Sequence, residues 1–426
     1  MKIVTISDSP TIFSGLARVH RHVIDALVEK GHVVLPCGWF AYDSDQTERI
    51  RRGGEVEPVF YQSTQGPVRV LAVPKAGNMN EMYAAYDVVD MLKPDLVITI
   101  GDHWNFYYVR AVKIKADFSF KWLPYFTVEH DDVEDKWEAL FRYADAILVP
   151  TEYGKRIVES CCDVETVMLP YGVDEKFRPL PKDDVRRIRE RKGCSGKVRF
   201  ITVAQNTWRK NLPALLQAVN LLKNMGLEDY VTFHLHTNVD AMDRQEGYLY
   251  DLRKIVSKMG LESLVTFPEG DETFSVFRAP KDEYMVEEYN ASDFLICPST
   301  TEGFSLPVVE AMACGLPVIA NSASTMPEHL GGSVGDVGRT GRGFLVASDL
   351  QITPPSRFMR VVRPEDLAAK IMDAFRMTAG GREGLSRMKE NCVKYGKERG
   401  WARTKDGLCE VVDRLAGKPK VVVEEF

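Results

Sequence analysis

Two glutamates frame the segment of this chain that is best equipped to hold a polar ligand. Seven residues separate Glu302 from Glu310, and a short helix is predicted between Pro307 and Gly315. Proline suits the first turn of a helix, and glycine suits the position after its last turn. The N–H groups at a helix start attract anions, and ionised carboxylates accept hydrogen bonds from hydroxyl groups. The segment therefore predicts a site for a hydroxyl-rich, anionic ligand.

Each of the two acids also has a simpler interpretation. Glu302 could balance the dipole of the following helix, and Glu310 could lie on the protein surface. Two glutamates at this spacing would be weak evidence by themselves, so the prediction rests on the whole segment with its loop, proline and glycine.

A second loop carries two adjacent cations. Arg209 and Lys210 follow a predicted strand at 200–203, and Asn211 is expected to cap a helix that has Pro213 in its first turn. A planar guanidinium and a compact ammonium beside a positive helix end suit a diphosphate. The alternative is a solvated basic pair with no ligand.

Strand ends in the first half of the chain offer weaker candidates. Gly15 follows the first strand and lets the backbone approach a ligand closely. A dinucleotide fingerprint would need three spaced glycines there, which argues against NAD or FAD. His130 could bind a sugar hydroxyl or share a proton. His103 has a similar position, and either histidine could instead be structural.

No metal site is predicted. His234 and His236 would point to one face of a strand, but no third ligand is nearby in the sequence, which favours a packed or solvated pair. Asp43 and Asp45 resemble an acidic metal-binding pair, yet no hydrophobic strand closely precedes them, so they are interpreted as loop residues.

Composition limits the classes of function. Lys and Arg number 55 against 61 Asp and Glu, a net charge of −6, so no nucleic-acid partner is predicted. No apolar run is long enough to span a membrane, although peripheral membrane contact stays open. The N-terminal apolar stretch is too short for a signal peptide. The eight cysteines lack a C-x-x-C pair and fit a reducing compartment, so a cytoplasmic location is expected.

The elements that must position these residues form a repeating pattern. Short apolar runs alternate with amphipathic stretches, which predicts parallel sheets covered by helices on both faces. The alternation breaks at 177–182, where prolines indicate a linker, and then restarts. Predicted strands lie at 4–6, 33–35, 68–73, 96–100, 125–128, 147–149, 167–169, 200–203, 231–235, 265–267, 294–297 and 318–320.

The pattern predicts two doubly wound, Rossmann-like α/β domains that face each other across a cleft. We expect an N-terminal domain at 1–178 and a C-terminal domain at 179–398. Residues 399–426 would form a last helix that returns to the first domain, followed by a tail. Ligands of such sheets bind outside the carboxyl ends of the strands, which is where the candidate loops lie.

The segment 302–318 reads EGFSLPVVEAMACGLPV and resembles the Glu-seven-residues-Glu signature of the retaining, GT-B-fold glycosyltransferases of family 4, also called glycosyl transferases group 1. Residues 170–174 resemble the domain-boundary motif of this family, with Tyr171 in place of the usual asparagine. The resemblance implies transfer of a hexose from a nucleotide-diphosphate sugar to an acceptor hydroxyl, without metal or cofactor. The acceptor would bind the first domain and the donor the second.

The resemblance also implies roles for individual residues. Glu310 would hold the donor ribose, and Glu302 would contact the transferred sugar near the reaction centre. Lys210 matches the phosphate lysine of the family, and Arg209 would compensate for Gln205, which stands in place of a family arginine. The remaining expected residues are the histidine of the active site, His130, and the donor-binding Gly15, Gly303, Phe304, Ser305 and Leu306, the last four through main-chain N–H groups.

Other activities stay open at this point. A glycan phosphorylase or a sugar-nucleotide epimerase on a related fold would share much of this sequence pattern. A protein that binds a nucleotide sugar without catalysis would share it too. The sugar, the nucleotide and the acceptor, which could be a glycan, lipid, protein or small molecule, are not specified by these residues.

Overall fold

The structure is a computed structural model of the 426-residue chain. It describes residues 1–42, 46, 57–73, 84–130, 135–239, 250–270, 280–353, 357–380 and 383–417. Asp43, Asp45 and the tail at 418–426 lie outside the described residues. The chain divides into one unit formed by Met1–Gly172 with Trp401–Phe426 and a second unit formed by Val173–Gly400.

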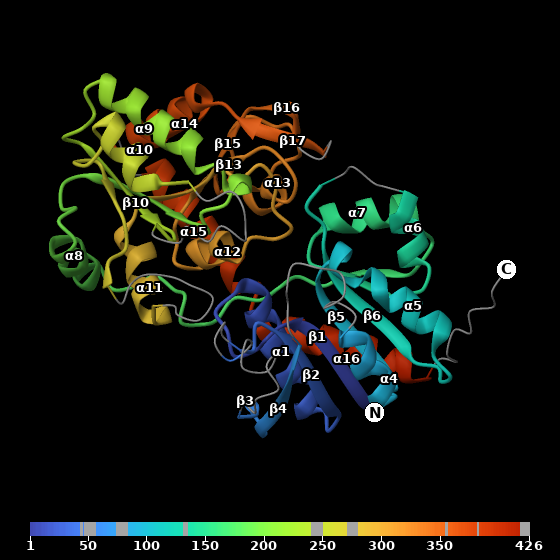
Figure 1. Cartoon of the computed structure of the whole chain (residues 1–426). Helices are drawn as coiled ribbons and strands as arrows, with labels where there is room; N and C mark the ends of the chain where they lie inside the picture. The colour runs from blue at the N-terminus through green and yellow to red at the C-terminus, as the bar shows by residue number, and fades with distance from the viewer. Residues whose placement is uncertain are drawn as a thin grey trace. The chain divides into compact units, whose positions relative to one another are not determined.

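The first unit is built on an eight-stranded sheet (Figure 1). Its strands are β1 (Lys2–Asp8), β2 (Val33–Trp39), β3 (Val59–Ser63), β4 (Gly66–Val73), β5 (Leu96–Asp102), β6 (Lys121–Thr127), β7 (Ile147–Val149) and β8 (Thr166–Met168). The order across the sheet is β3-β4-β2-β1-β5-β6-β7-β8. Only the β3–β4 pair is antiparallel within this sheet, and the other neighbours are parallel.

Helices cover both faces of this sheet. They are α1 (Gly15–Glu29), α4 (Ala84–Leu92), α5 (Tyr107–Lys115), α6 (Asp135–Phe141), α7 (Glu152–Cys161) and α16 (Trp401–Gly417), with a short 3-10 turn η1 (His103–Phe106). Alternate residues of β1 serve the two faces. Val4 and Ile6 join the buried cluster of α4, α5 and α6, whereas the Thr5 hydroxyl lies 2.7 Å from Nε2 of His20 on α1. The last helix, α16, packs against α1, where the Cys409 thiol donates to a backbone carbonyl.

The second unit contains a seven-stranded sheet. Its strands are β9 (Val198–Val203), β10 (Val231–His236), β11 (Val265–Thr266), β12 (Phe294–Cys297), β13 (Val318–Asn321), β14 (Gly338–Arg339) and β15 (Gly343–Val346). The order is β11-β10-β9-β12-β13-β15-β14, and only β14 runs antiparallel to its neighbour within this sheet. A separate hairpin follows, formed by β16 (Ser348–Thr353) and β17 (Arg357–Val362).

Helices also cover both faces of the second sheet, so the prediction of two doubly wound α/β sheets is confirmed. In Figure 1, α9, α10 and α14 lie on one side of the sheet, and α11, α12 and α15 lie on the other. The helices are α8 (Lys182–Arg191), α9 (Leu212–Asn224), α10 (Leu252–Met259), α11 (Asp282–Ala291), α12 (Leu306–Ala313), α13 (Met326–Leu330), α14 (Pro364–Gly380) and α15 (Glu383–Lys397), with a 3-10 turn η2 (Trp208–Lys210).

The winding of the second sheet determines which loops meet. Strands β9, β10 and β11 progress toward one edge, and β12, β13 and β15 progress toward the other. The direction therefore reverses between β9 and β12, and ligands of open α/β sheets bind outside the carboxyl ends of the strands at such a reversal. The loops at 204–211 and 298–305 begin there. In the first unit, the corresponding reversal lies between β1 and β5.

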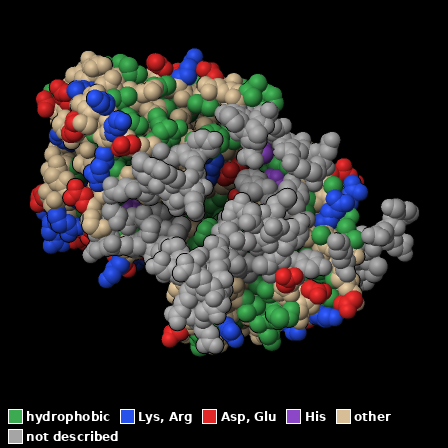
Figure 2. Space-filling model, viewed as in Figure 1, with side chains coloured by type: hydrophobic (Ala, Val, Ile, Leu, Met, Phe, Trp, Pro, Cys, Tyr) green, Lys and Arg blue, Asp and Glu red, His purple; other side chains and the backbone are tan. Residues whose placement is uncertain are grey.

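The described side chains visible in Figure 2 are mixed in charge. Figure 2 shows Lys and Arg side chains interspersed with Asp and Glu on the visible face of the molecule rather than gathered into one basic region. In the part of the chain that the structure describes, no helix combines the length and the apolar content needed to cross a bilayer.

Candidate functional site

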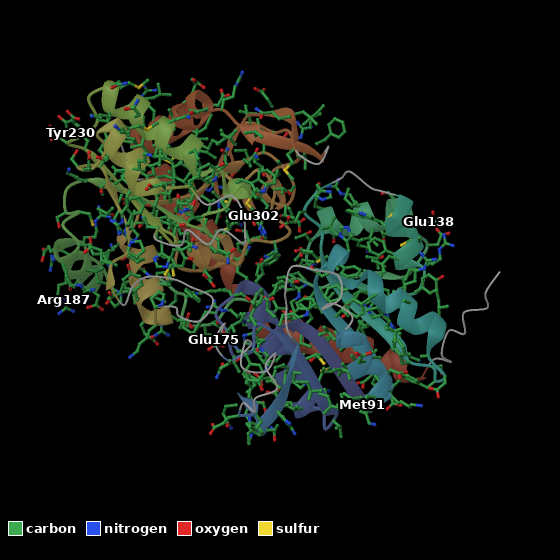
Figure 3. All side chains as sticks on the ribbon, viewed as in Figure 1. Met91, Glu138, Glu175, Arg187, Tyr230 and Glu302 are labelled. Atoms are coloured by element: carbon green, nitrogen blue, oxygen red, sulfur yellow. The ribbon has the colours of Figure 1, made fainter. Side chains whose placement is uncertain are left out.

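The Glu302 carboxylate is the centre of a buried ionic cluster in the second unit. The side chain is only 5% exposed, and its Oε1 accepts hydrogen bonds from Lys210 Nζ at 2.6 Å and from the Ser299 hydroxyl at 2.7 Å. Figure 3 labels Glu302 on the loop between β12 and α12. The cluster thus joins the two loops that the sheet reversal brings together.

Arg209 completes this cluster and also ties the two loops at the backbone. The Arg209 Nη1 donates to the Thr301 carbonyl at 3.0 Å and lies 3.3 Å from Oε2 of Glu302. The Thr300 N–H donates to the Arg209 carbonyl at 2.9 Å. Arg209 and Lys210 are therefore held against Glu302, and the alternative of a solvated basic pair is wrong.

Electrostatics keep Glu302 ionised. Burial alone would raise the pKa of this carboxyl group. The charges of Lys210 and Arg209, together with the hydrogen bonds from Lys210 and Ser299, outweigh burial and lower the pKa to about 2. The two cations that contact this carboxylate lie beside helix starts, an arrangement that suits an anionic ligand.

Glu310 lies one turn inside α12 and is also buried, at 7% exposure. Its Oε2 accepts a hydrogen bond of 3.0 Å from the hydroxyl of Tyr289, a fully buried residue of α11. The alternative that Glu310 is a surface acid is therefore wrong. A buried carboxylate that already has one hydroxyl donor is suited to accept a second from a ligand.

Two residues just before α13 form hydrogen bonds to the backbone of the loop between the two glutamates. The Ser324 hydroxyl accepts from the Glu302 N–H at 3.0 Å, and the Thr325 hydroxyl donates to the Glu302 carbonyl at 3.1 Å. Ser305, just before α12, has a positive φ of 70°, a conformation that non-glycine residues rarely adopt. Gly303, Phe304 and Ser305 thus lead into the N-terminal end of α12, which begins at Leu306.

The start of α9 differs from the sequence prediction. Pro213 occupies the first turn as expected, but the Asn211 side chain makes no capping hydrogen bond. Asn211 instead adopts a left-handed conformation, with φ of 51°, and its N–H closes the η2 turn by donating to the Trp208 carbonyl at 3.1 Å. Asparagine tolerates this conformation better than most residues. The turn places Arg209 and Lys210 beside Glu302, while Gln205 is exposed.

Gly15 and His130 belong to the first unit. Gly15 is the first residue of α1, and the preceding Ser14 caps this helix by accepting from the Ala17 N–H at 3.0 Å. The Ser14 hydroxyl donates to Asp8 Oδ2 at 2.6 Å, which ties the end of β1 to the helix. A role of Gly15 in donor binding stays a prediction.

His130 follows β6 and is buried, at 8% exposure. Its ring centroid lies 5.5 Å from that of Trp137, and His103 lies on the same indole at 3.8 Å. The two histidines predicted at strand ends thus share an aromatic neighbour on α6. A catalytic role of His130 stays a prediction.

His234 and His236 are both buried on β10. His234 Nδ1 lies 3.0 Å from the Thr266 hydroxyl, and its Nε2 lies 3.8 Å from the Glu288 carboxylate. Burial lowers the pKa of both imidazoles, to about 3 and about 4 respectively. The interpretation as a packed pair is confirmed. Among the described residues, no group of three or more His, Cys, Asp or Glu side chains could hold a metal ion.

Sequence reasoning missed several residues that shape the site. Ser299 lies in the predicted segment but gave no signal beyond its hydroxyl group. Tyr289, Ser324 and Thr325 lie on other elements, and only the three-dimensional fold brings them to the glutamates. No spacing rule within one element would have found them.

A family model described as glycosyl transferases group 1 matches residues 196–353. Among curated proteins, mannosylfructose-phosphate synthase of Agrobacterium fabrum is 30% identical over 154 residues, which is 36% of this chain and 31% of that protein. Uncharacterized glycosyltransferase 335 of Sulfolobus islandicus rod-shaped virus 1 is 57% identical over 151 residues, 35% of this chain and 39% of that protein. The chain thus spans about a third of the length of these relatives.

Solved structures match nearly the whole chain. Sucrose-phosphate synthase from Thermosynechococcus elongatus has a TM-score of 0.71 at 16% identity and covers 97% of this chain and 99% of its own. Anabaena HepE in complex with UDP-glucose has a TM-score of 0.67 at 16% identity and covers 97% of this chain and 100% of its own. The chain therefore has the fold of the GT-B glycosyltransferases and carries a domain of the glycosyl transferases group 1 family.

Proposed function

We propose that this protein is a retaining glycosyltransferase that moves a hexose from a nucleotide-diphosphate sugar to an acceptor hydroxyl. The observation that carries the proposal is the cluster of the partly buried Lys210 and Arg209 around the buried Glu302 at the reversal of the second sheet. It lies next to the start of α12, and Glu310 follows one turn later. The match to the glycosyl transferases group 1 family over this region supports it.

The donor would be held by both glutamates. The Glu310 carboxylate would accept a hydrogen bond from a ribose hydroxyl. The Tyr289 hydroxyl already donates to Oε2 of this carboxylate and orients it. Glu302 would accept from a hydroxyl of the transferred sugar. Main-chain N–H groups at Gly303, Phe304, Ser305 and Leu306 would donate to sugar and phosphate oxygens, as is common at helix N-termini.

The chemistry follows from where charge develops. Departure of the leaving group places negative charge on the diphosphate and positive character on the sugar ring. Lys210 and Arg209 would stabilise the diphosphate, aided by the start of α12, so the proposed reaction needs no metal. These cations already hold Glu302 through charge-assisted hydrogen bonds. Binding would therefore add the diphosphate to a preorganised cationic pair.

The acceptor would bind the N-terminal domain at 1–178, and the donor would bind the C-terminal domain at 179–398. His130, buried beside Trp137 in the first unit, would hydrogen-bond a sugar hydroxyl or take part in proton transfer. Because the eight cysteines are all free thiols, a reducing, cytoplasmic setting fits the proposal.

A thermal-shift screen against UDP-, GDP- and ADP-sugars would identify the donor, because a ligand that binds only the native state raises the unfolding temperature. UDP-hexoses come first, since Anabaena HepE was solved with UDP-glucose. Incubation of the selected donor with candidate acceptors should then release a nucleoside diphosphate and form a glycosidic bond of the donor's own anomeric configuration, which NMR can assign.

The same assay separates the alternative functions. A phosphorylase would require inorganic phosphate, and an epimerase would convert one nucleotide sugar to another without releasing the nucleoside diphosphate. A non-catalytic binder would give a thermal shift and no product. His130→Ala should slow transfer while leaving the affinity for the donor close to that of the wild type. Equal turnover in this variant would contradict the proposed role of His130.

A further inference from the structure

The loop between the two glutamates depends on hydrogen bonds to its carbonyl groups. Each peptide unit is planar, so the carbonyl of one residue and the N–H of the next point in opposite directions within one rigid group. The Thr325 bond to the Glu302 carbonyl therefore also determines the direction of the Gly303 N–H. The next anchor along the loop is the Phe304 carbonyl, whose peptide partner is the Ser305 N–H.

His329 on α13 holds the Phe304 carbonyl. Its Nε2 lies 2.5 Å from this oxygen, and because a carbonyl can only accept, Nε2 must carry the proton. The His329 ring is buried, at 1% exposure, and meets the Phe304 ring edge-on at a centroid distance of 5.0 Å. The imidazole thus contacts both the main chain and the side chain of one loop residue.

Tyr395 on α15 contacts the other nitrogen of this imidazole. Its hydroxyl lies 2.6 Å from His329 Nδ1, and since Nε2 holds the proton of the neutral ring, the hydroxyl donates and Nδ1 accepts. The guanidinium groups of Arg342 and Arg399 lie over the Tyr395 ring, at 4.3 and 3.4 Å from its centroid. Burial lowers the pKa of His329 to about 3, so the ring is neutral at physiological pH.

Backbone strain makes this support necessary. Ser305 has φ of 70° and ψ of 79°, and a non-glycine residue keeps such a conformation only where its surroundings enforce it. The bond from His329 fixes the peptide unit that enters Ser305. Without that bond, the unit could rotate toward a less strained conformation and carry the Ser305 N–H away from its present direction.

We propose that His329 is a positioning residue that aims the Ser305 N–H at the diphosphate of the donor, with Tyr395 bonded to the second nitrogen of its imidazole. The inference rests on the proposed function for the identity of the ligand, and it assigns to His329 no contact with the ligand itself. It adds to the site a chain of two hydrogen bonds, from Tyr395 on α15 to His329 on α13 and from His329 to the Phe304 carbonyl before α12.

Two substitutions at His329 separate positioning from packing. His329→Leu fills the space but cannot donate, whereas His329→Gln supplies an N–H that reaches the Phe304 carbonyl. With UDP and inorganic pyrophosphate as probes, we expect His329→Leu to weaken binding about tenfold, the effect of losing one buried hydrogen bond. The kcat for transfer should also fall, because the charge on the leaving diphosphate grows in the transition state. His329→Gln should recover most of both losses.

The Ser305 N–H can be observed directly. The sequence contains four Phe-Ser pairs, so labelling with 13C-carbonyl phenylalanine and 15N-serine gives few NMR signals, and the one that disappears in Ser305→Gly is assigned to this peptide. It should shift in wild type when UDP is added. Without ligand, the chemical shift of this signal should differ from wild type in His329→Leu and match wild type in His329→Gln. Ile371→Ala, a core variant of α14 outside the site, controls for lost stability.

The outcomes are distinct. The positioning role is overturned if His329→Leu binds UDP and pyrophosphate as tightly as wild type. It is also overturned if the Ser305 signal does not change in His329→Leu, or if the leucine and glutamine variants lose equal affinity and turnover. If the wild-type protein binds none of UDP, GDP, ADP and pyrophosphate, the proposed function fails instead. The positioning of the peptide is then judged from the Ser305 signal of the free proteins.

Discussion

Lys210 Nζ lies 2.6 Å from Glu302 Oε1, although 92 positions separate the two residues in the chain. The contact exists because β9 and β12 are neighbours at the point where the winding of the sheet reverses. One residue belongs to the loop after β9 and the other to the loop after β12. The ion pair is therefore a direct product of the topology, and it couples a phosphate-binding candidate to a sugar-binding candidate.

Replacing Lys210 by methionine should weaken binding of a nucleoside diphosphate. A charge-assisted hydrogen bond contributes about 1.5–3 kcal/mol, so the Kd should rise by about 10- to 100-fold. Isothermal titration calorimetry with UDP or GDP measures this. Lys223→Met is the matched control, because Lys223 lies on α9 and donates to the Gly260 carbonyl instead. Equal affinities in both variants would exclude Lys210 from the donor site.

Glu310 should be sensitive to one hydroxyl group of the ribose. In the wild-type protein, the 2′-deoxy or the 3′-deoxy form of the nucleotide should bind about tenfold more weakly than the ribose form. The reason is that the Glu310 carboxylate loses the ribose hydroxyl that donates to it. In Glu310→Ala the deoxy and ribose forms should bind alike. Tyr289→Phe removes the hydroxyl that donates to Glu310 and should give an intermediate result. A ribose preference that survives in Glu310→Ala would contradict the assignment.

Local signals predicted much of the site from sequence. The helix between Pro307 and Gly315 was expected because proline and glycine act on the backbone where they stand, and α12 spans Leu306–Ala313 with Gly315 at φ of 80°. The strand before it was predicted at 294–297, and β12 has these bounds. The rule that ligands bind at strand ends also pointed to the two loops that meet.

The features that the sequence did not predict depend on contacts between segments that are distant in the chain. The glycines between residues 331 and 343 give no strand signal, but Gly338–Arg339 pairs with β15 as β14. The β16–β17 hairpin was not predicted, and in the structure its Leu350 and Ile352 are exposed rather than part of the core. His329 and Tyr289 gained their roles from packing between helices, which no single segment encodes.

The pKa of Glu302 predicts a pH-dependent contribution to stability. Its folded pKa of about 2 lies below the ordinary value of 4.5, so the stabilisation is complete above about pH 5 and is lost as the pH falls toward 2. The difference corresponds to on the order of 3 kcal/mol. Glu302→Gln should therefore unfold at a lower temperature than wild type at pH 7.

Thermal unfolding from pH 7 to pH 3 tests this expectation. The gap between wild type and Glu302→Gln should stay constant down to about pH 5 and then narrow. Glu262→Gln, at an exposed acid of the same unit, controls for a general effect of removing negative charge. A gap that widens on acidification would show that the carboxylate is not stabilised by Lys210 and Arg209.

Two glycines in the second unit should respond in opposite ways to alanine. A Cβ on Gly396 of α15 would lie 2.5 Å from the Ala313 Cα of α12, which is closer than real contacts allow, whereas a Cβ on Gly380 of α14 would meet nothing within 4 Å. Gly396→Ala should destabilise by about 1–3 kcal/mol through overpacking. Gly380→Ala should be neutral or stabilise by up to about 1 kcal/mol, since alanine favours helix.

The helix displaced in Gly396→Ala is the one that carries Glu310, so the variant should also weaken nucleotide binding. Alanine at Gly396 must push α15 and α12 apart, because its Cβ would clash with the Ala313 backbone, which cannot rotate away. Unfolding temperatures and UDP titrations on both variants measure the two effects together. If Gly396→Ala lost stability but bound UDP like wild type, the close approach of α15 would serve the fold alone, and the position of Glu310 would not depend on it.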